Sequence, residues 1–331
     1  MKKLLTIVVP TYNMQDYLRR CLDSLIVPEE QMKQIEVLVI NDGSKDNSSA
    51  IAHEYQDKYP DTFRVIDKEN GNYGSCINVG VKEATGKYFK ILDSDDWYDT
   101  KQISLFLGKL KDIDTDAVFT NFTIVSGDNK RIYSSKNVDF CKAYSFDAFS
   151  FKASGNQDIF CMHSLCFKLS LLRDIKLELQ QGISYTDNEF CYYPLVKATD
   201  FVFIDNNLYQ YNVSRDGQTI SKEQLKKNFR HFFLIGDRMV KNYLQTSHIT
   251  IDRKETLFVF ILNILQLMYY SGLVLDKNIS NDNLENLKKL DALVGKDGDL
   301  NTAVLNFKFH RVPFVWIWRK FHFRLSKFIF K

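Results

Sequence analysis

The sequence predicts an α/β fold: a mixed, mostly parallel sheet with helices on both faces, followed by a helical C-terminal region. In the amino-terminal third, short apolar runs at 4–10, 35–40, 63–66 and 88–92 alternate with stretches whose apolar residues recur at helical spacing. The loops between these runs are short, and such strand–helix alternation favours a parallel sheet covered by helices. From residue 222 onward the pattern is helical.

The apolar runs have the composition of strands that are buried on both faces. Residues 4–10 and 35–40 are dominated by Leu, Ile and Val. The run at 88–92 has high β propensity and follows Gly86. Further strands are predicted at 116–125, 201–204 and 208–211, and helices at 17–25, 46–59, 75–84 and 190–196.

Composition and charge bound the class of protein. The chain has 331 residues, of which 45% are hydrophobic, enough for two domains or one large domain with additions. The formal net charge is +3, but residues 307–331 hold seven basic residues and no acid, which leaves −4 on residues 1–306. The positive charge therefore belongs to the tail, and no nucleic-acid partner is expected.

The cysteines and the amino terminus predict a reduced, cytoplasmic protein. The six cysteines lack metal-ligand spacing; Cys161 and Cys166 flank His163 but do not make a recognisable zinc site. Met1 is followed almost directly by the first strand, without the apolar segment of a signal peptide.

Polar residues follow three of the predicted strands, at 11–13, 41–44 and 93–96. In open α/β sheets, ligands bind outside the carboxyl ends of the strands, so these segments are expected to converge. Asp93 and Asp95 are oxygen ligands that suit Mg²⁺ or Mn²⁺ held jointly with phosphate. A structural alternative for this stretch is an acidic turn that leads into a helix capped at Asp99 or Thr100.

Two common nucleotide-binding motifs are absent. The first strand is not followed by the Gly-x-Gly-x-x-Gly of a dinucleotide-binding domain, and no glycine-rich loop ends in Gly-Lys-Ser/Thr. The phosphates of a bound nucleotide would therefore be neutralised by a metal ion at the aspartates.

The motifs at 9–13, 41–46 and 93–96, in this order and spacing, resemble those of the family 2 glycosyltransferases with the GT-A fold. Segments 71–74, 78–80 and 86–88 also match the family. The resemblance is close over residues 1–125 and continues loosely to about residue 221. It implies three parts: a nucleotide-sugar-binding and catalytic domain at 1–221, a helical region at 222–306 and a basic aromatic tail at 307–331.

The resemblance implies a role for each motif residue. Asp42 would read the nucleobase, Asp93 would reach the ribose or sugar, and Asp95 would hold Mn²⁺ or Mg²⁺. Asp42 can also be a turn residue that closes on Ser44. The other residues implied at the donor are Pro10, Thr11, Tyr12, Asn13, Asn78, Ser94 and Arg215. Three of them have a structural alternative: Tyr12 can pack beside the strand, Asn78 can be a buried structural amide, and Arg215 can be a solvated loop residue.

The family places a catalytic aspartate at the start of a helix, usually in a Glu-Asp pair, where this chain has Thr186-Asp187. The departure leaves the base between Asp187 and Glu189, and Asp187 is preferred. Both acids can also stabilise the helix amino terminus.

The function implied is transfer of a sugar from a nucleotide donor, a UDP-sugar, to an acceptor hydroxyl with inversion. The acceptor would be a saccharide or lipid-linked saccharide in surface-polysaccharide assembly. A nucleotidyltransferase and a non-catalytic sugar- or membrane-binding module are the alternatives. The first would carry a glycine-rich basic loop, and the second would tolerate loss of the acids. A homo-oligomer is left open.

Two C-terminal segments bear on membranes. Residues 257–275 carry no charge, but the amides of Asn263 and Gln266 favour a buried or interfacial helix over a span. Residues 313–331 can form one amphipathic helix lying on the inner face of the cell membrane; a terminal helix docked on the body or on another subunit is the alternative. The predicted apolar face holds Phe314, Ile317, Trp318, Phe321, Leu325, Phe328 and Ile329.

Overall fold

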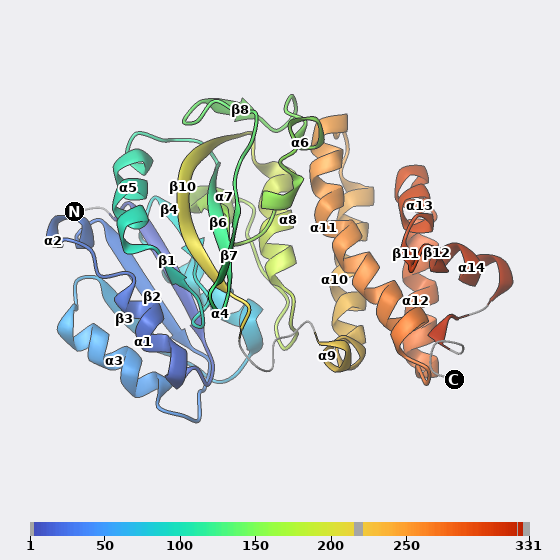
Figure 1. Cartoon of the computed structure of the whole chain (residues 1–331), viewed down its shortest axis with the longest axis horizontal. Helices are drawn as coiled ribbons and strands as arrows, with labels where there is room; N and C mark the ends of the chain where they lie inside the picture. The colour runs from blue at the N-terminus through green and yellow to red at the C-terminus, as the bar shows by residue number, and fades with distance from the viewer. Residues whose placement is uncertain (1–2, 215–220, 323, 327–331) are drawn as a thin grey trace. The chain divides into compact units, whose positions relative to one another are not determined.

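The computed structural model describes residues 3–214, 221–322 and 324–326 (Figure 1). The chain divides into two compact units. The first, here called the sheet unit, comprises Met1–Arg215 and Ile251–Arg253. The second, the helical unit, comprises Asp216–Thr250 and Lys254–Lys331 and includes the basic tail.

The sheet begins with the four predicted parallel strands. They lie in the order β3-β2-β1-β4, and β1 pairs in parallel with both β2 and β4. The chain thus steps outward from β1 to β3 and then returns across β1 to β4. This reversal makes the carboxyl ends of β1 and β4 a topological switch point, where α/β sheets bind ligands. The bounds are β1 Leu5–Thr11, β2 Ile35–Asn41, β3 Phe63–Asp67 and β4 Tyr88–Ile91.

Beyond β4 the sheet becomes mixed. The order continues β9-β6-β10-β5, with β9 antiparallel to both neighbours and β10 parallel to β6. β10 is one strand where two were predicted, because the polar interruption between Ile204 and Tyr209 is absorbed as an irregularity in the pairing with β6. The bounds are β5 Trp97–Tyr98, β6 Ala117–Ser126, β7 Asn129–Tyr133, β8 Ala143–Ser145, β9 Leu165–Lys168 and β10 Asp200–Asn212.

Helices cover both faces, as right-handed crossovers on either side of the switch point require (Figure 1). The Asp99 carboxylate accepts the backbone N–H groups of Lys101 and Gln102 and so caps α5, as the structural alternative for that acid proposed. The bounds are α1 Gln15–Asp23, α2 Glu29–Met32, α3 Ser48–Lys58, α4 Asn72–Glu83, α5 Thr100–Leu110, α6 Phe151–Ser154, α7 Leu169–Asp174 and α8 Asp187–Lys197.

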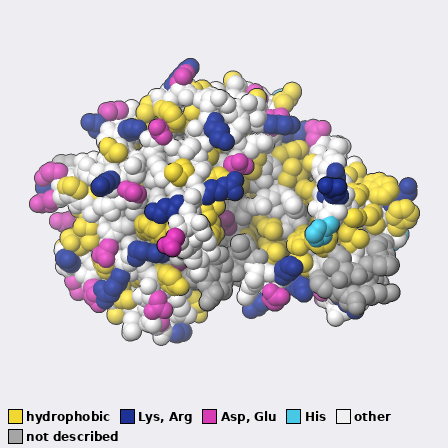
Figure 2. Space-filling model, viewed as in Figure 1, with side chains coloured by type: hydrophobic (Ala, Val, Ile, Leu, Met, Phe, Trp, Pro, Cys, Tyr) yellow, Lys and Arg dark blue, Asp and Glu magenta, His cyan; other side chains and the backbone are white. Residues whose placement is uncertain are grey.

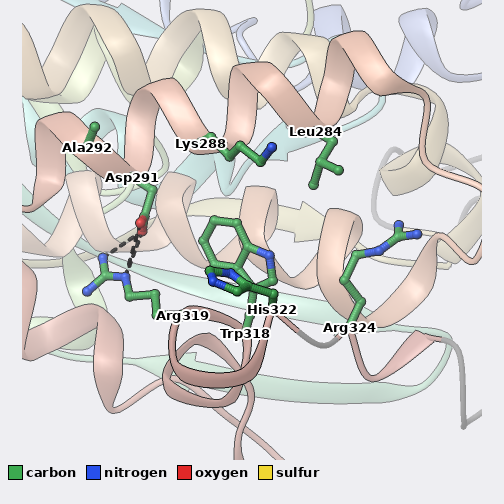
Figure 3. Close-up of a pocket in the computed structure, with 8 residues that line it drawn as sticks. All are labelled: Leu284, Lys288, Asp291, Ala292, Trp318, Arg319, His322 and Arg324. Atoms are coloured by element: carbon green, nitrogen blue, oxygen red, sulfur yellow. Dashed lines mark hydrogen bonds and ion pairs between the residues drawn. The ribbon is translucent and has the colours of Figure 1, made fainter.

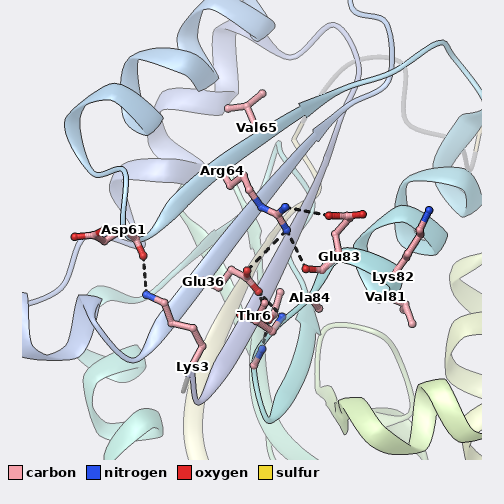
Figure 4. Close-up of polar contacts among 12 residues, drawn as sticks. Lys3, Thr6, Glu36, Asp61, Arg64, Val65, Val81, Lys82, Glu83 and Ala84 are labelled. Carbon is pink, nitrogen blue, oxygen red and sulfur yellow. Dashed lines mark hydrogen bonds and ion pairs between the residues drawn. The ribbon is translucent and has the colours of Figure 1, made fainter. Parts of the chain in front are cut away.

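A buried polar cluster ties the amino ends of the strands together, at the end of the sheet opposite the switch point (Figure 4). Glu36 is 8% exposed, and its Oε2 accepts the Thr6 hydroxyl and the Thr85 N–H, each at 2.7 Å. The Arg64 guanidinium lies 3.9 Å from Glu36 Oε1 and donates to Glu83 at 3.0 Å.

Glu36→Ala should lower the free energy of unfolding by about 1–3 kcal/mol, because it leaves the buried Thr6 hydroxyl without its acceptor. Urea denaturation measures the change. Glu54→Ala is the matched control, since it breaks the Arg19–Glu54 pair, whose side chains are 53% and 55% exposed, and should leave the midpoint almost unchanged. Equal midpoints for Glu36→Ala and the wild type would refute a stabilising role for the cluster.

The helical unit consists of helices and one short hairpin. Its first helix-rich part includes α11, whose first three residues belong to the sheet unit. The bounds are α9 Lys222–Lys227, α10 Phe229–Gln245, α11 Ile251–Tyr270, α12 Asn281–Val294, α13 Gly298–Leu305, β11 Lys308–Phe309, β12 Val312–Pro313 and α14 Phe314–Phe321. α11 and the π-helical turn Ser271–Leu275 are together long and apolar enough to cross a membrane by length and composition. However, 61% of the most apolar window is buried within the structure, as in the core helix of a soluble protein.

The prediction of one amphipathic helix over 313–331 is wrong. α14 ends at Phe321 because His322 adopts a left-handed backbone conformation with φ of 54°. Phe314 and Trp318 of the predicted lipid-facing side are buried, so the docked alternative describes that side better. Trp316 and Phe321 are 41% and 60% exposed. The predicted positions Phe328 and Ile329 lie outside the described residues.

Candidate active site

The loops after β1 and β2 are joined by backbone and side-chain hydrogen bonds. Asn13, in a left-handed conformation with φ of 53°, donates its N–H to Ser44 Oγ at 3.1 Å and accepts the Lys45 N–H at 2.7 Å. The Asp42 N–H donates to the Thr11 carbonyl at 2.8 Å. The first two predicted motifs therefore form one surface at the switch point.

Asp42 organises this surface from a buried position. Its carboxylate accepts the N–H groups of Gly71 and Asn72, both at 2.9 Å, and lies 2.5 Å from the Lys68 ammonium. These contacts satisfy the amino terminus of α4, which explains why α4 begins before the predicted residue 75. The alternative in which Asp42 closes a turn on Ser44 differs in detail, since the Ser44 N–H donates to the side chain of Asn41 and not to that of Asp42. Sequence reasoning missed Lys68.

The other donor-side residues lie in two environments. Pro10, Thr11 and Ser94 are buried, whereas Tyr12 is 45% exposed and presents a free ring face. The Asn78 amide accepts the Leu179 N–H at 2.8 Å and donates to the Leu179 carbonyl at 2.9 Å, which matches its structural alternative. Arg215 lies outside the described residues.

The acidic loop after β4 is held by β10. The Asp96 carboxylate is buried and accepts the Tyr209 hydroxyl at 2.6 Å and the Asn212 N–H at 2.7 Å. The Asp93 N–H donates to the same Tyr209 oxygen at 3.1 Å. Burial, and then the neighbouring charges of Asp93 and Asp95, raise the pKa of Asp96 well above the usual range of a carboxyl. Sequence reasoning overlooked Asp96, and its only signal there was a third acid in the run.

Tyr73 connects α4 to the acidic loop. Its hydroxyl donates to Asp93 Oδ1 at 3.0 Å and lies 3.2 Å from the Met162 sulfur. Burial, followed by the charges of Asp93 and Asp187, raises the pKa of Tyr73 well above its usual value. Tyr73 falls within the segment 71–74 that matches the family, but the resemblance assigned it no role.

The two candidate bases on α8 have different environments. Glu189 is buried, and its carboxylate accepts the backbone N–H of Gln180 at 2.9 Å and the Gln180 amide at 3.0 Å. Asp187 is partly exposed, and the Asn188 amide lies 3.4 Å from each of its oxygens. Burial raises the pKa of Asp187 above that of an ordinary aspartate. Glu189 thus has a structural position, whereas Asp187 is accessible to an acceptor.

Gly74 permits the close approach of α4 to the segment that leads into α8. A Cβ at residue 74 would lie 2.2 Å from the Gln180 carbonyl oxygen and 3.1 Å from Thr186 Oγ1. Any larger residue would push α4 away from the segment that leads into α8.

A group of metal-ligand atoms lies beside this site. One ligand atom from each of Asp93, Asp96 and His163 falls within 4.8 Å of the other two. Burial, with a smaller effect of Lys90, lowers the pKa of His163 to about 3, so the imidazole is neutral and can ligate. Two carboxylates and an imidazole fit a divalent cation such as Mn²⁺. Asp95 is not in this group; its backbone carbonyl accepts the Arg20 guanidinium at 3.1 Å.

Comparison with known proteins gives a family and a fold. The sequence model of the family described as Glycosyl transferase family 2 matches residues 6–174. An uncharacterized glycosyltransferase of Mycoplasma genitalium, MG025, is 39% identical over 112 residues, 32% of this chain and 37% of that protein. The chain therefore spans little more than a third of the length of this curated relative.

Two solved structures share the fold. Staphylococcus aureus TarS 1–349 in complex with UDP-GlcNAc has a TM-score of 0.68 and 17% identity, covering 92% of this chain and 84% of that one. The Pyrobaculum calidifontis mannosyltransferase PcManGT in complex with GDP-Man and Mn²⁺ has a TM-score of 0.54 and 14% identity, covering 96% of this chain and 83% of that one. These matches confirm the predicted mixed α/β architecture.

Proposed function

Because this chain belongs to glycosyltransferase family 2, we propose that it moves a glycosyl group from a UDP-sugar to an acceptor hydroxyl with inversion. The observation that carries the proposal is the meeting of the motif loops at the switch point. The loops after β1 and β2 are joined through Asn13, Ser44 and Lys45. Asp42 accepts the first N–H groups of α4, and the Tyr73 hydroxyl of the same helix donates to Asp93 in the loop after β4.

The donor side is built from the loops after β1, β2 and β4. In this proposal Tyr12 offers its exposed face to the nucleobase, Asp42 lies at the base edge, and Asp93 faces the ribose. Pro10, Thr11, Asn13 and Ser94 shape the wall, and Arg215 keeps its predicted donor role. Asn78 acts indirectly, by tying α4 to the backbone of Leu179. A bound Mg²⁺ or Mn²⁺, with Asp95 as predicted ligand, would neutralise the diphosphate and stabilise charge on the leaving group.

The acceptor side is built around Asp187. Its carboxylate takes the proton of the acceptor hydroxyl as that oxygen forms a bond to the anomeric carbon. The bond from the same carbon to the diphosphate breaks on the opposite face, which inverts the configuration. On the donor side, the Tyr73 hydroxyl holds the Asp93 carboxylate through a hydrogen bond of 3.0 Å. The partial exposure of Asp187 leaves room for an acceptor.

The test is a product assay on the whole chain with a panel of UDP-sugars and either Mg²⁺ or Mn²⁺. Free UDP, increased by a saccharide acceptor, is the expected product. Release of pyrophosphate would identify a nucleotidyltransferase. Binding of UDP-sugar without any product would identify a non-catalytic module.

We further propose that the acceptor is a saccharide or lipid-linked saccharide at the inner face of the membrane. The support is a contact surface on α14 made of Trp316, Lys320 and Phe321. The two aromatic rings lie 5.9 Å apart, and the Lys320 ammonium is 4.9 Å from the Trp316 ring centre. Figure 2 shows hydrophobic side chains gathered over this part of the helical unit. Exposed aromatics beside cations are typical of proteins that rest in the lipid headgroup layer.

A pocket lined by residues of α12, α14 and the segment after α14 adds positive charge to the same unit (Figure 3). Its volume is about 430 Å³, and Trp318 lines it together with Lys288, Arg319 and Arg324. Among the described lining residues, Asp291 is the one acid, and it accepts the Arg319 guanidinium at 2.6 Å. The surplus of positive charge is complementary to anionic headgroups.

Replacing Trp316 and Phe321 together by serine should lower binding to vesicles that contain anionic lipid several-fold, as measured by sedimentation. Both side chains are exposed, so the fold should persist. Truncation is a poorer test, because it removes the buried Phe314 and Trp318 as well. The matched control replaces Leu105 and Ile132, which are 57% and 60% exposed in the sheet unit. Equal binding by both double variants would contradict a contact through α14.

A further inference from the structure

We infer that His163 is a protein ligand of the divalent cation at the acidic loop, and that its nitrogen makes the site prefer Mn²⁺ to Mg²⁺. This inference rests on the proposed function, because it concerns the cation that accompanies the nucleotide-sugar. It goes beyond that function, since the motif resemblance implied only Asp95 as the metal ligand. His163 lies on the loop that leads into β9, in a stretch that carries no motif of the family.

The spacing of the ligand atoms fits one shared ion. Ligand atoms that lie about 2.1 Å from a small divalent cation are separated by at most about 4.2 Å across it. The atoms of Asp93, Asp96 and His163 fall within 4.8 Å of one another, so shifts of a few tenths of an ångström bring them onto one ion. The imidazole makes no hydrogen bond within the described part of the chain, so its nitrogens are available to an ion or a ligand.

The candidate ligands are already oriented by neighbouring groups. Tyr209 and Asn212 fix the Asp96 carboxylate, and Tyr73 binds Asp93. The imidazole stacks on Tyr211, with ring centres 4.3 Å apart and an interplanar angle of 24°. Metal-ligating side chains are commonly held in this way by a surrounding layer of contacts.

Lys90 fixes the backbone that carries His163. Its side chain lies in β4 with no solvent exposure and donates to the carbonyls of His163 at 2.8 Å and Leu165 at 3.0 Å. Burying an ammonium group is costly, and the cost is offset here by hydrogen bonds to the two carbonyls that flank Ser164. The same strand thus leads into Asp93 and holds the loop that carries His163.

A nitrogen ligand has a consequence for metal choice. Mg²⁺ is bound almost entirely by oxygen, whereas imidazole suits transition-metal ions. The preference for Mn²⁺ should therefore depend on His163, while Mg²⁺ binding should depend mainly on the carboxylates.

The test measures Mn²⁺ binding to the full chain through the electron paramagnetic resonance signal of free Mn²⁺. His163→Gln should weaken Mn²⁺ binding by about tenfold or more, and should remove the ¹⁴N coupling seen by pulsed resonance in the wild type. Mg²⁺ affinity, measured by competition, should change much less. His53→Gln is the matched control, because that imidazole pairs with Asp67 elsewhere in the sheet unit.

Unchanged Mn²⁺ affinity and retained ¹⁴N coupling in His163→Gln would overturn the inference. His163→Asn provides a second variant, and thermal unfolding shows whether each variant is folded. The outcome is separable from that of the proposed function. If UDP is released and Mn²⁺ binds equally well to the His163 variants, only this inference is refuted. Mn²⁺ binding that requires His163, without UDP release, refutes the proposed transfer alone.

Discussion

Asp187→Asn should reduce turnover by about 100-fold or more while binding of the UDP-sugar stays close to that of the wild type. The asparagine keeps the size of the side chain but cannot accept a proton from the acceptor hydroxyl. Asp187 belongs to the acceptor side, so the donor contacts of the loops after β1 and β2 are untouched. Single-turnover kinetics with saturating donor, combined with UDP binding by calorimetry, measures both quantities.

The partial burial of Asp187 gives this prediction two further signatures. Only the ionised carboxylate can act as the base, and burial raises its pKa, so kcat/KM should fall as the pH drops through that raised value. The acid limb should therefore lie above the pKa of an ordinary aspartate and disappear in the variant. Since the folded state disfavours the charge, Asp187→Asn should be at least as stable as the wild type near neutral pH.

Glu189→Gln is the matched control on the same helix. Its carboxylate accepts two donors of Gln180, so an amide would place a donor against a donor. The expected effect is therefore loss of stability, with activity retained in the fraction that remains folded. An inactive but fully folded Glu189→Gln, together with an active Asp187→Asn, would transfer the role of base to Glu189.

The parts of the fold that local sequence determines were predictable. The apolar runs that became β1, β2, β3 and β4 are buried strands, and their polar ends meet at one edge because parallel strands share a direction. Long-range contacts set what was missed. α4 begins early because Asp42, from a distant loop, accepts its first N–H groups. β9 lies in a stretch without clear periodicity and is specified by its pairing with β4 and β6.

The candidate site shows the same division. Asp93 and Asp187 could be found from the family motifs, because both occupy recurring positions at the ends of elements. Tyr209 and His163 could not, because their contacts are made only in the folded chain. Tyr73 lay in the matching segment 71–74, but its contact with Asp93 could not be predicted. The prediction for the tail was wrong for another reason. Its sequence has helical periodicity, but Phe314 and Trp318 are buried by packing inside the helical unit.

Asp95→Ala should abolish transfer and metal-dependent binding of UDP while the protein stays folded. The reason is electrostatic: without this carboxylate the site would lose part of the charge that holds a cation against the diphosphate. Asp99→Ala is the control in the same stretch. It removes the cap of α5, which costs about 1 kcal/mol of stability, but should leave metal binding intact.

The readouts are UDP release and UDP binding with and without added Mn²⁺, each repeated in excess chelator. Full activity of Asp95→Ala, or of the wild type in chelator, would exclude the predicted metal dependence. Loss of Mn²⁺ binding in Asp93→Ala and His163→Gln, but not in Asp95→Ala, would contradict Asp95 as the ligand. The metal ligands would then be Asp93, Asp96 and His163, whose ligand atoms lie within 4.8 Å of one another. Asp95 would then act on the donor without touching the ion, because it lies between Asp93 and Asp96 on the same loop.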